Sequence, residues 1–285
     1  MLFIVGIVIL FGSVLGGFLP HGKLEVLNQP LEVLIICGCA LAGFIIANPK
    51  DVIIGVIKSL ASVIKGARHD KQSYLDLLTL LYTLLRMAKT QGPLALEEHA
   101  DNPEESAIFL NFPRILANRA AVVFLSDYLR MMTMGTDNAH EMEALIDEEI
   151  ETHHIELHRL AKAVEAVADG LPAFGIVAAV LGVITAMGAI LEPPEVLGGM
   201  IGAALVGTFL GVLLAYGIVG PLGSLLKDHA DAETKYLQCI KASLIAYMQG
   251  YAPAMCVEFS RKILFSNERP TFSEVEDAVA EAPTA

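Results

Sequence analysis

Long stretches without charged side chains divide this chain into apolar and polar parts. Residues 1–19 contain no Asp, Glu, Lys or Arg, and residues 31–49 contain only Glu32, close to their start. Residues 171–226 contain only Glu192 and Glu195. Because about 20 apolar residues cross a bilayer as a helix, we predict one span in each of the first two stretches and two in the third.

The predicted fold is all-α: a polytopic membrane protein with four transmembrane helices and a large cytoplasmic helical domain. Pro193 and Pro194, between two glutamates, predict the turn that separates the third and fourth spans. The predicted segments are the first span 1–19, a periplasmic loop 20–30, the second span 31–49, the cytoplasmic helical domain 50–170, the third span 171–191, a periplasmic turn 192–195, the fourth span 196–226, and a cytoplasmic C-terminal helix and tail 227–285.

Basic residues set the predicted orientation. They cluster directly after the second and fourth spans, whereas the two short loops contain only Lys23. By the positive-inside rule, the long segments and both termini are predicted to be cytoplasmic. The first apolar run has no basic residue before it and no small-residue cleavage site after it, so we expect a retained span. The basic residues are Lys50, Lys58, Lys65 and Arg68, then Lys227, Lys235 and Lys241.

The polar segments show helical periodicity and no strand-like alternation. Leucines recur every three or four residues from Tyr74 to Leu85, predicting a helix that ends near Gln91–Gly92–Pro93. A second pattern from Met142 to Val164 predicts a helix that feeds almost directly into the third span. Residues 102–105, Asn-Pro-Glu-Glu, predict a helix start capped by Asn102. Residues 274–285 are small and acidic, and we expect them to be disordered.

Composition excludes several function classes. The chain has 54% hydrophobic and 18% charged residues, and its net charge of -13 argues against binding nucleic acid through phosphates. The four cysteines form no CxxC pair, so neither a disulfide nor a zinc site is predicted. His154 and His158 share a helical face, but a solvated face is the favoured interpretation over a metal site. No nucleotide-binding or hydrolase motif is present, so we predict no enzyme, metal or cofactor.

Small residues recur every four positions in the third and fourth spans. This stripe is open to two interpretations, plain hairpin packing or an oligomer whose helices line a narrow path. The few polar side chains there, Thr185, Thr208 and Tyr216, suggest a polar streak along such a path, although a threonine hydroxyl can also bond to the preceding turn. The stripe comprises Ala178, Gly182 and Ala186, then Gly199, Ala203, Gly207, Gly211 and Ala215.

None of the four predicted spans carries a carboxylate or histidine at depth, which an ion relay normally needs. Either the chain is not coupled to ion flow or a partner helix supplies the titrating group. Pro172 and Pro221 lie at the cytoplasmic ends of the third and fourth spans. Each removes a backbone hydrogen bond and marks either a hinge or a membrane boundary.

Several segments resemble the motility protein A family of flagellar stator subunits. They are 171–180 (LPAFGIVAAV), 206–217 (VGTFLGVLLAYG) and 250–253 (GYAP), with weaker likeness at 147–153 and 268–270. The likeness extends over essentially the whole chain, including its loop lengths. The related Tol and Exb energising proteins differ in span number and lack the long loop, and a proton-driven energiser of this kind, without a rotor, is the alternative function.

The resemblance implies a bacterial inner-membrane protein with defined partners. A single-span subunit, motility protein B, brings the essential aspartate, and five A subunits surround two B subunits. Ion flow then drives the A ring against the rotor switch protein FliG. Thr208 matches a threonine that lines the ion path, while Pro172 and Pro221 match two functional prolines. Sodium-type relatives have threonine at the position of Ala179, so alanine here favours protons.

The resemblance also implies a rotor-facing charge pair. The family pattern is an arginine followed eight residues later by a glutamate, which corresponds here to Lys89 and Glu97. Lysine keeps the charge but loses the two-pronged guanidinium, and Arg86, one turn earlier, is the alternative basic residue. Glu98 and Glu149 are weaker candidates. Without the resemblance, each of these would be interpreted as an ordinary solvated charge.

Overall fold

A computed structural model describes the chain except residues 1, 23, 66–68, 137 and 283–285. Its described residues form helices and no strand, as predicted. The chain divides into two compact units, one made of Met1–Gly66 with Glu156–His229 and the other of Ala67–Ile155 with Ala230–Ala285. Lys23 and Arg68, which contributed to the predicted orientation, lie outside the described residues.

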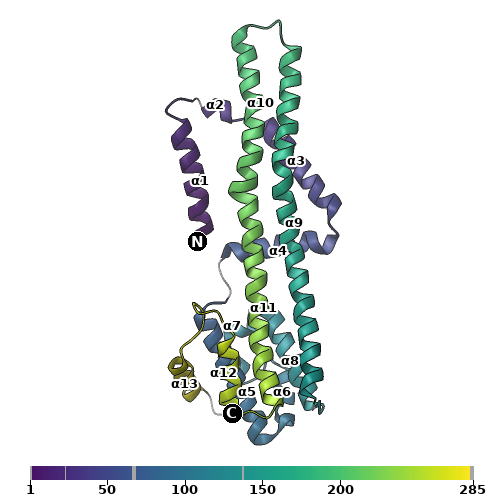
Figure 1. The fold of residues 1–285 in the computed structure, drawn as a ribbon, viewed down its shortest axis with the longest axis vertical. Coiled ribbons are helices and arrows are strands. Elements are labelled where there is room, and N and C mark those ends of the chain that lie inside the picture. Colours follow the sequence, from purple (N-terminus) through teal and green to yellow (C-terminus); the bar gives the residue numbers. More distant parts are fainter. Residues whose placement is uncertain (1, 23, 66–68, 137, 283–285) are drawn as a thin grey trace. The chain divides into compact units, whose positions relative to one another are not determined.

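The first unit contains the apolar helices (Figure 1). Three helical stretches are long and apolar enough to cross a membrane, and α1 is apolar but has 17 residues. Apolar helices therefore occur at all four predicted positions, while the count of four spans stays a prediction. The elements are α1 (Leu2–Phe18), α2 (Leu24–Leu27), α3 (Pro30–Ala47), α4 (Lys50–Lys65), the second part of α9 (Ala139–Gly188), α10 (Pro194–Leu214), the π-helical η3 (Ala215–Val219) and the first part of α11 (Gly220–Met248).

Both prolines of the predicted hinges lie within continuous helical structure. Pro172 is inside the 50-residue helix α9, which runs from the cytoplasmic pattern into the third span as predicted. The five π-helical residues of η3 end two residues before Pro221. A proline has no amide hydrogen to donate, and single π turns inside helices are frequent at functional sites. The helix thus changes its hydrogen-bond register just ahead of Pro221.

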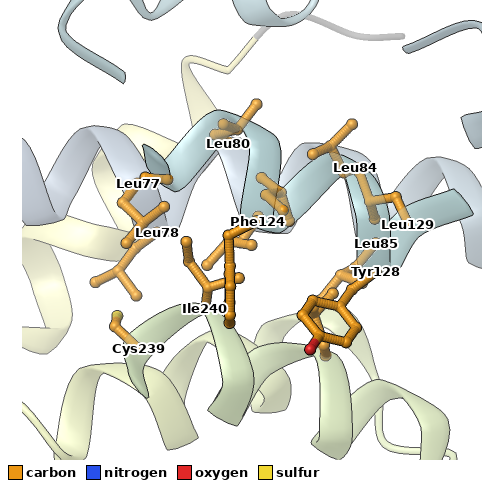
Figure 2. Packing of buried hydrophobic residues seen from close by; sticks show 14 of the residues in the cluster. Leu77, Leu78, Leu80, Leu84, Leu85, Phe124, Tyr128, Leu129, Cys239 and Ile240 are labelled. Atoms are coloured by element: carbon orange, nitrogen blue, oxygen red, sulfur yellow. The ribbon is translucent and has the colours of Figure 1, made fainter. Parts of the chain in front are cut away.

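The second unit is built around α5 and α11 (Figure 2). Helix α5 begins after Asp70, whose carboxylate accepts a hydrogen bond from the Ser73 amide, and ends at Gln91 before Gly92, which has a φ of 93°. The predicted helix and its end are therefore confirmed. The elements of this unit are α5 (Lys71–Gln91), η1 (Pro93–Leu96), α6 (Glu97–Asp101), η2 (Phe109–Asn111), α7 (Pro113–Leu116), α8 (Arg119–Thr133), α12 (Pro253–Lys262) and α13 (Phe272–Ala280), with the remaining parts of α9 and α11.

The leucines of α5 fill the core of this unit. Leu77, Leu81 and Leu84 are fully buried, and they pack with side chains of α8 and α11. Figure 2 shows Phe124 and Tyr128 between these helices. The three-and-four spacing of apolar positions thus corresponds to one buried helical face.

The predicted helix start at Asn102 is wrong. Asn102 follows α6 as its C-terminal cap, with its amide bonded to the Glu98 carbonyl, and the next residues form a turn closed by the Glu105 amide on the Asn102 carbonyl at 3.1 Å. The same residue types serve both purposes, because Asn and Pro are also common where helices end. Because α6 directly precedes Asn102, this residue ends a helix and does not begin one.

The expectation of a disordered tail is also wrong as far as Ala280. Helix α13 starts with a capping box in which Thr271 and Glu274 bond to each other's backbone amides. Lys71 on α5 also contacts the Glu274 carboxylate at 2.7 Å. The backbone amides of Thr271 and Glu274, which have no partner within the helix, are therefore hydrogen-bonded by side chains. These bonds stabilise the start of α13 despite the acidic composition of the segment. Residues 283–285 lie outside the described residues.

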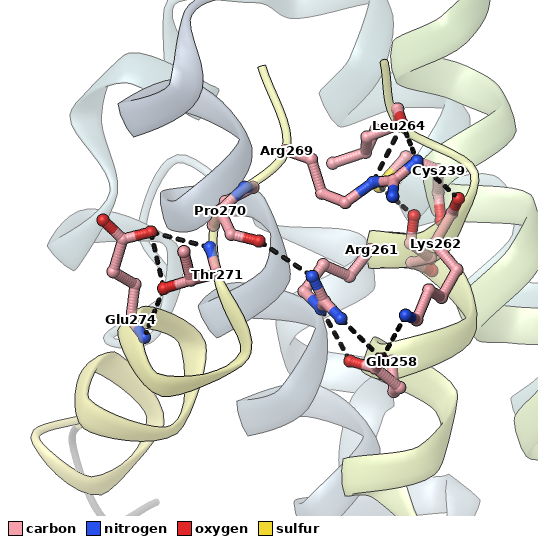
Figure 3. A network of polar contacts seen from close by, with 10 residues as sticks. Cys239, Glu258, Arg261, Lys262, Leu264, Arg269, Pro270, Thr271 and Glu274 are labelled. Carbon is pink, nitrogen blue, oxygen red and sulfur yellow. Dashed lines mark hydrogen bonds and ion pairs between the residues drawn. The ribbon is translucent and has the colours of Figure 1, made fainter. Parts of the chain in front are cut away.

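A network centred on Arg261 connects α12 to the segment leading to α13 (Figure 3). The guanidinium donates two hydrogen bonds of 2.7 Å to Glu258 and one of 3.0 Å to the Pro270 carbonyl. Arg269 donates to the Leu264 carbonyl at 2.6 Å. The chain after α12 is thereby held through its backbone carbonyls.

Candidate functional site in the apolar unit

Helices α9 and α10 meet with their backbones almost in contact. An added Cβ atom at Gly211 would lie 2.7 Å from the Leu171 carbonyl oxygen and 2.8 Å from the Gly175 Cα. One at Gly175 would lie 2.9 Å from the Gly207 carbonyl oxygen. Part of the small-residue stripe therefore packs the hairpin against itself. Not every residue of the stripe takes part in this packing, because an added Cβ at Gly199 meets no described atom within 4 Å.

Two of the four candidate ion-path residues lie at this crossing. An added Cβ at Gly207 would be 3.3 Å from the Ala179 amide nitrogen, and one at Gly175 would be 3.4 Å from the Thr208 Cα. The backbones of Ala179 and Thr208, 29 positions apart in the sequence, thus each adjoin a glycine of the opposite helix at this crossing.

The other two candidates are placed differently. Thr185 donates its hydroxyl to the Leu181 carbonyl at 3.0 Å, one turn earlier in the same helix, and is exposed. This satisfies the hydroxyl without a path. Tyr216 lies in the π-helical turn with 69% of its surface exposed. The structure therefore does not group Thr185 or Tyr216 with Ala179 and Thr208.

Glu32, the one acidic residue of the second predicted span, reaches the neighbouring helices from the edge of its own. Glu32, in the first turn of α3, has a buried Oε2 atom without a hydrogen-bond partner in the described part of the chain. This oxygen lies 3.0 Å from the position of an added Cβ at Gly207, and Oε1 lies 3.6 Å from that at Gly182. Glu32 is at the edge of its own helix, as the sequence indicates. Its carboxylate nevertheless reaches glycines of α9 and α10.

Depth along the neighbouring helices is what the charge pattern could not reveal. Gly207 lies about 20 Å along α10 from Pro194, at the usual rise of 1.5 Å per residue. The signal in the sequence was a single glutamate at the start of an apolar stretch. Which side chains it meets depends on packing between helices, because α3 contacts α10 only in the folded chain.

The candidate rotor-facing residues lie in the second unit. Lys89 is in the last turn of α5, and Glu97 and Glu98 form the first turn of α6, just after η1. All three side chains are exposed, and no ion pair involves them within the described residues. Arg86 differs, because it is half-buried with its guanidinium carbon 5.9 Å from the centre of the Tyr82 ring. Lys89 is therefore the more exposed of the two candidate basic residues.

Glu149 is engaged with the core of the second unit. It accepts a short hydrogen bond from the hydroxyl of buried Tyr128. Burial and this neighbouring carboxylate raise the pKa of Tyr128 above its ordinary value of 10. Glu149 thus has an intramolecular role that sequence reasoning missed.

The histidine face on α9 is likewise not simply solvated. His154 Nδ1 lies 3.0 Å from the Thr234 hydroxyl oxygen on α11 and 4.0 Å from an oxygen of Asp231. The favoured sequence interpretation is therefore wrong for His154, whose imidazole is half-buried. The spacing of histidines alone could not distinguish a packed face from an exposed one.

Comparison with known proteins decides the family. The motility protein A N-terminal family matches residues 4–92, and the MotA/TolQ/ExbB proton channel family matches residues 117–239. Motility protein A of Escherichia coli is 45% identical over 98% of this chain and 95% of its own length. The chain belongs to the motility protein A family.

Further relatives and solved structures agree with this membership. Chemotaxis protein LafT of Vibrio parahaemolyticus is 34% identical over 97% of both chains. The C. jejuni MotAB structure has a TM-score of 0.77 at 21% identity, covering 93% of this chain and 96% of that one. The MotAB stator complex of Bacillus subtilis gives 0.73 at 23%, covering 90% and 92%. At these identities the structures show the motility protein A fold. Family membership and apolar helices are consistent with an inner-membrane protein.

Proposed function

We propose that this chain is the A-type subunit of a flagellar stator that converts ion flow into torque. The observation that carries the proposal is the 45% identity to a motility protein A over nearly the full length of both chains. The match to the motility protein A N-terminal family at residues 4–92 favours this function over a Tol- or Exb-like energiser.

The proposed assembly contains five copies of this chain around two single-span B-type subunits, each supplying an ion-binding aspartate. The structural relatives are MotAB complexes, which supports such a partner. In the proposed topology four helices cross the inner membrane and both termini are cytoplasmic. Lys50 and Lys58 on α4 support this orientation, since basic residues favour the cytoplasmic side.

The proposed ion is the proton. Ala179 offers no side-chain oxygen at the helix crossing, and an alanine there leaves fewer oxygen ligands for a metal cation. Protonation and deprotonation of the aspartate on the B-type subunit would change the packing of α9 and α10. Pro172 and Pro221 are the proposed points at which this change passes to the cytoplasmic helices. Lys89, Glu97 and Glu98 form the proposed contact with FliG.

Complementation tests the function. Expression of this gene in a strain lacking its own A-type stator gene is expected to restore swimming, because the chain would assemble with the partner. An uncoupler should stop the restored swimming, and replacement of external sodium should not. Membrane accumulation without swimming would contradict the stator function. Sodium dependence would retain that function and reject the proton.

Charge reversal tests the rotor contact. Lys89→Glu and Glu97→Lys are each expected to reduce stall torque several-fold. Both side chains are exposed, and in the proposed contact each acts on an opposite charge of FliG. A reciprocal reversal on FliG should restore part of the torque. The matched control is Glu276→Lys, an equally exposed carboxylate on α13. If the control lowers torque as much as Glu97→Lys, the effect is not specific to this surface.

A further inference from the structure

The carboxyl group of Glu32 occupies a space formed by glycines. Its oxygens lie 3.6 Å and 3.0 Å from where Cβ atoms would stand at Gly182 on α9 and Gly207 on α10. Any larger residue at Gly207 would press on Oε2 and also on Ala178, at 3.2 Å. The hairpin thus leaves room for a polar group from a third helix.

One oxygen of this carboxyl group has no hydrogen-bond partner in the described part of the chain. This atom, Oε2, is buried. A buried polar atom without a hydrogen bond destabilises the fold, so its presence points to a functional reason for keeping it. Other acidic residues of the apolar stretches differ, since Glu192 in the turn after α9 and Glu195 in the first turn of α10 are exposed.

The position of Glu32 coincides with the proposed ion path. Gly207, beside the Glu32 carboxylate, also adjoins the Ala179 backbone, and Thr208 is the next residue. The unpartnered carboxyl oxygen therefore lies beside a glycine that also adjoins the Ala179 backbone and directly precedes Thr208. Ionisable groups within spans commonly mark ion or proton routes.

We propose that Glu32 is a proton-exchanging group of the ion path, contributed by this chain and acting in addition to the partner's aspartate. This inference rests on the proposed stator function. A proton arriving from the external side binds the Glu32 carboxylate, and the same carboxyl later releases a proton toward the partner's carboxylate, so the group is regenerated in each cycle. Glu32 is thus a transfer site, and the spans of this chain do more than enclose the path.

The decisive variants are Glu32→Gln, which fills the same space without exchanging a proton, and Glu32→Asp, which retains exchange. The control is Glu25→Gln on α2, an exposed carboxylate seven residues earlier. Near stall a motor works close to equilibrium, so torque follows the driving force, whereas unloaded speed follows the transfer rate. Glu32→Gln is therefore expected to lower unloaded speed about tenfold or more while stall torque per stator changes little.

Glu32→Asp should recover a substantial part of the unloaded speed, and Glu25→Gln should match the wild type. Equal losses of speed and torque in Glu32→Gln would indicate a packing role and overturn the inference. Unchanged unloaded speed would overturn it as well. Failure of the wild-type gene to restore swimming would instead count against the proposed function.

A second measurement does not depend on motility. Dicyclohexylcarbodiimide modifies protonated carboxyl groups in apolar surroundings, and the labelled residue is identified by mass spectrometry of the purified full chain. We expect pH-dependent labelling at Glu32 and none at Glu25. Absence of label at Glu32 across the pH series would overturn the inference even where swimming is restored.

Discussion

Gly211→Ala is expected to abolish swimming, although it adds a single methyl group. The new carbon would stand 2.7 Å from the Leu171 carbonyl oxygen and 2.8 Å from the Gly175 Cα, both backbone atoms of α9. A side chain can relieve such a clash by changing its rotamer, but helical backbone atoms cannot. Helices α9 and α10 must therefore move apart. Overpacking of this kind costs about 1–3 kcal/mol, and here it also shifts Thr208, one turn away.

Gly199→Ala is the matched control. It lies on the same helix, but an added Cβ there meets no described atom within 4 Å. Alanine is favoured over glycine by about 1 kcal/mol inside a helix, so this variant should be neutral or slightly more stable. Both substitutions add the same methyl group, and they differ only in the atoms that this group would contact.

Swimming assays and the amount of each variant in the membrane provide the measurement. Loss of motility with Gly211→Ala and normal motility with Gly199→Ala would support the close crossing. Normal swimming with Gly211→Ala would show that the two backbones do not approach this closely in the working stator. A larger residue at Gly211 should lower membrane accumulation as well.

The gaps between charges predicted the positions of the apolar helices because the cost of a buried charge acts on each residue independently of its neighbours. The ends were less accurate. The third span was predicted to reach residue 191, whereas α9 ends at Gly188. The approach to a turn contains apolar residues too, so composition does not mark the last helical hydrogen bond.

Contacts between distant segments escaped prediction for a common reason. Glu32 meets Gly207, and Tyr128 meets Glu149, through packing that no local pattern specifies. The family resemblance pointed to Ala179 and Thr208, and in the structure the backbone of each adjoins a glycine of the α9–α10 crossing. The family resemblance did not point to Glu32. The charge pattern noted this residue only as a charge at the edge of a span.

Arg261→Met is expected to destabilise the second unit by about 2–4 kcal/mol. Arg261 is 7% exposed and donates three hydrogen bonds, two of them to Glu258. Methionine fills the space of the apolar stem but leaves a partly buried carboxylate and the Pro270 carbonyl without their donor. The control Lys262→Met removes a cation from the next position, where the side chain is 62% exposed and 3.8 Å from Glu258. Its effect should stay within about 0.5 kcal/mol.

Thiol exposure reports this destabilisation in the full chain. Cys239 and Cys256 are fully buried, and burial raises the pKa of their thiols to about 12 and about 11. A maleimide should therefore label them only when the second unit opens. Mass spectrometry separates these sites from Cys37 and Cys39. Arg261→Met should label faster at Cys239 than the wild type, and Lys262→Met should not.

The effect of Arg261→Met should also depend on pH. Hydrogen bonding to Arg261 lowers the pKa of Glu258 below its ordinary value of 4.5. A carboxyl with a lowered folded-state pKa stabilises the fold above its unfolded pKa, and this contribution is lost as pH falls through the folded value. The ratio of the labelling rates of Arg261→Met and the wild type at each pH cancels the pH dependence of the thiol reaction itself. This ratio is expected to be largest at neutral pH and to fall below about pH 4.5. A ratio that stays constant through this range would show that Arg261 acts by packing and through Pro270, without the charge on Glu258.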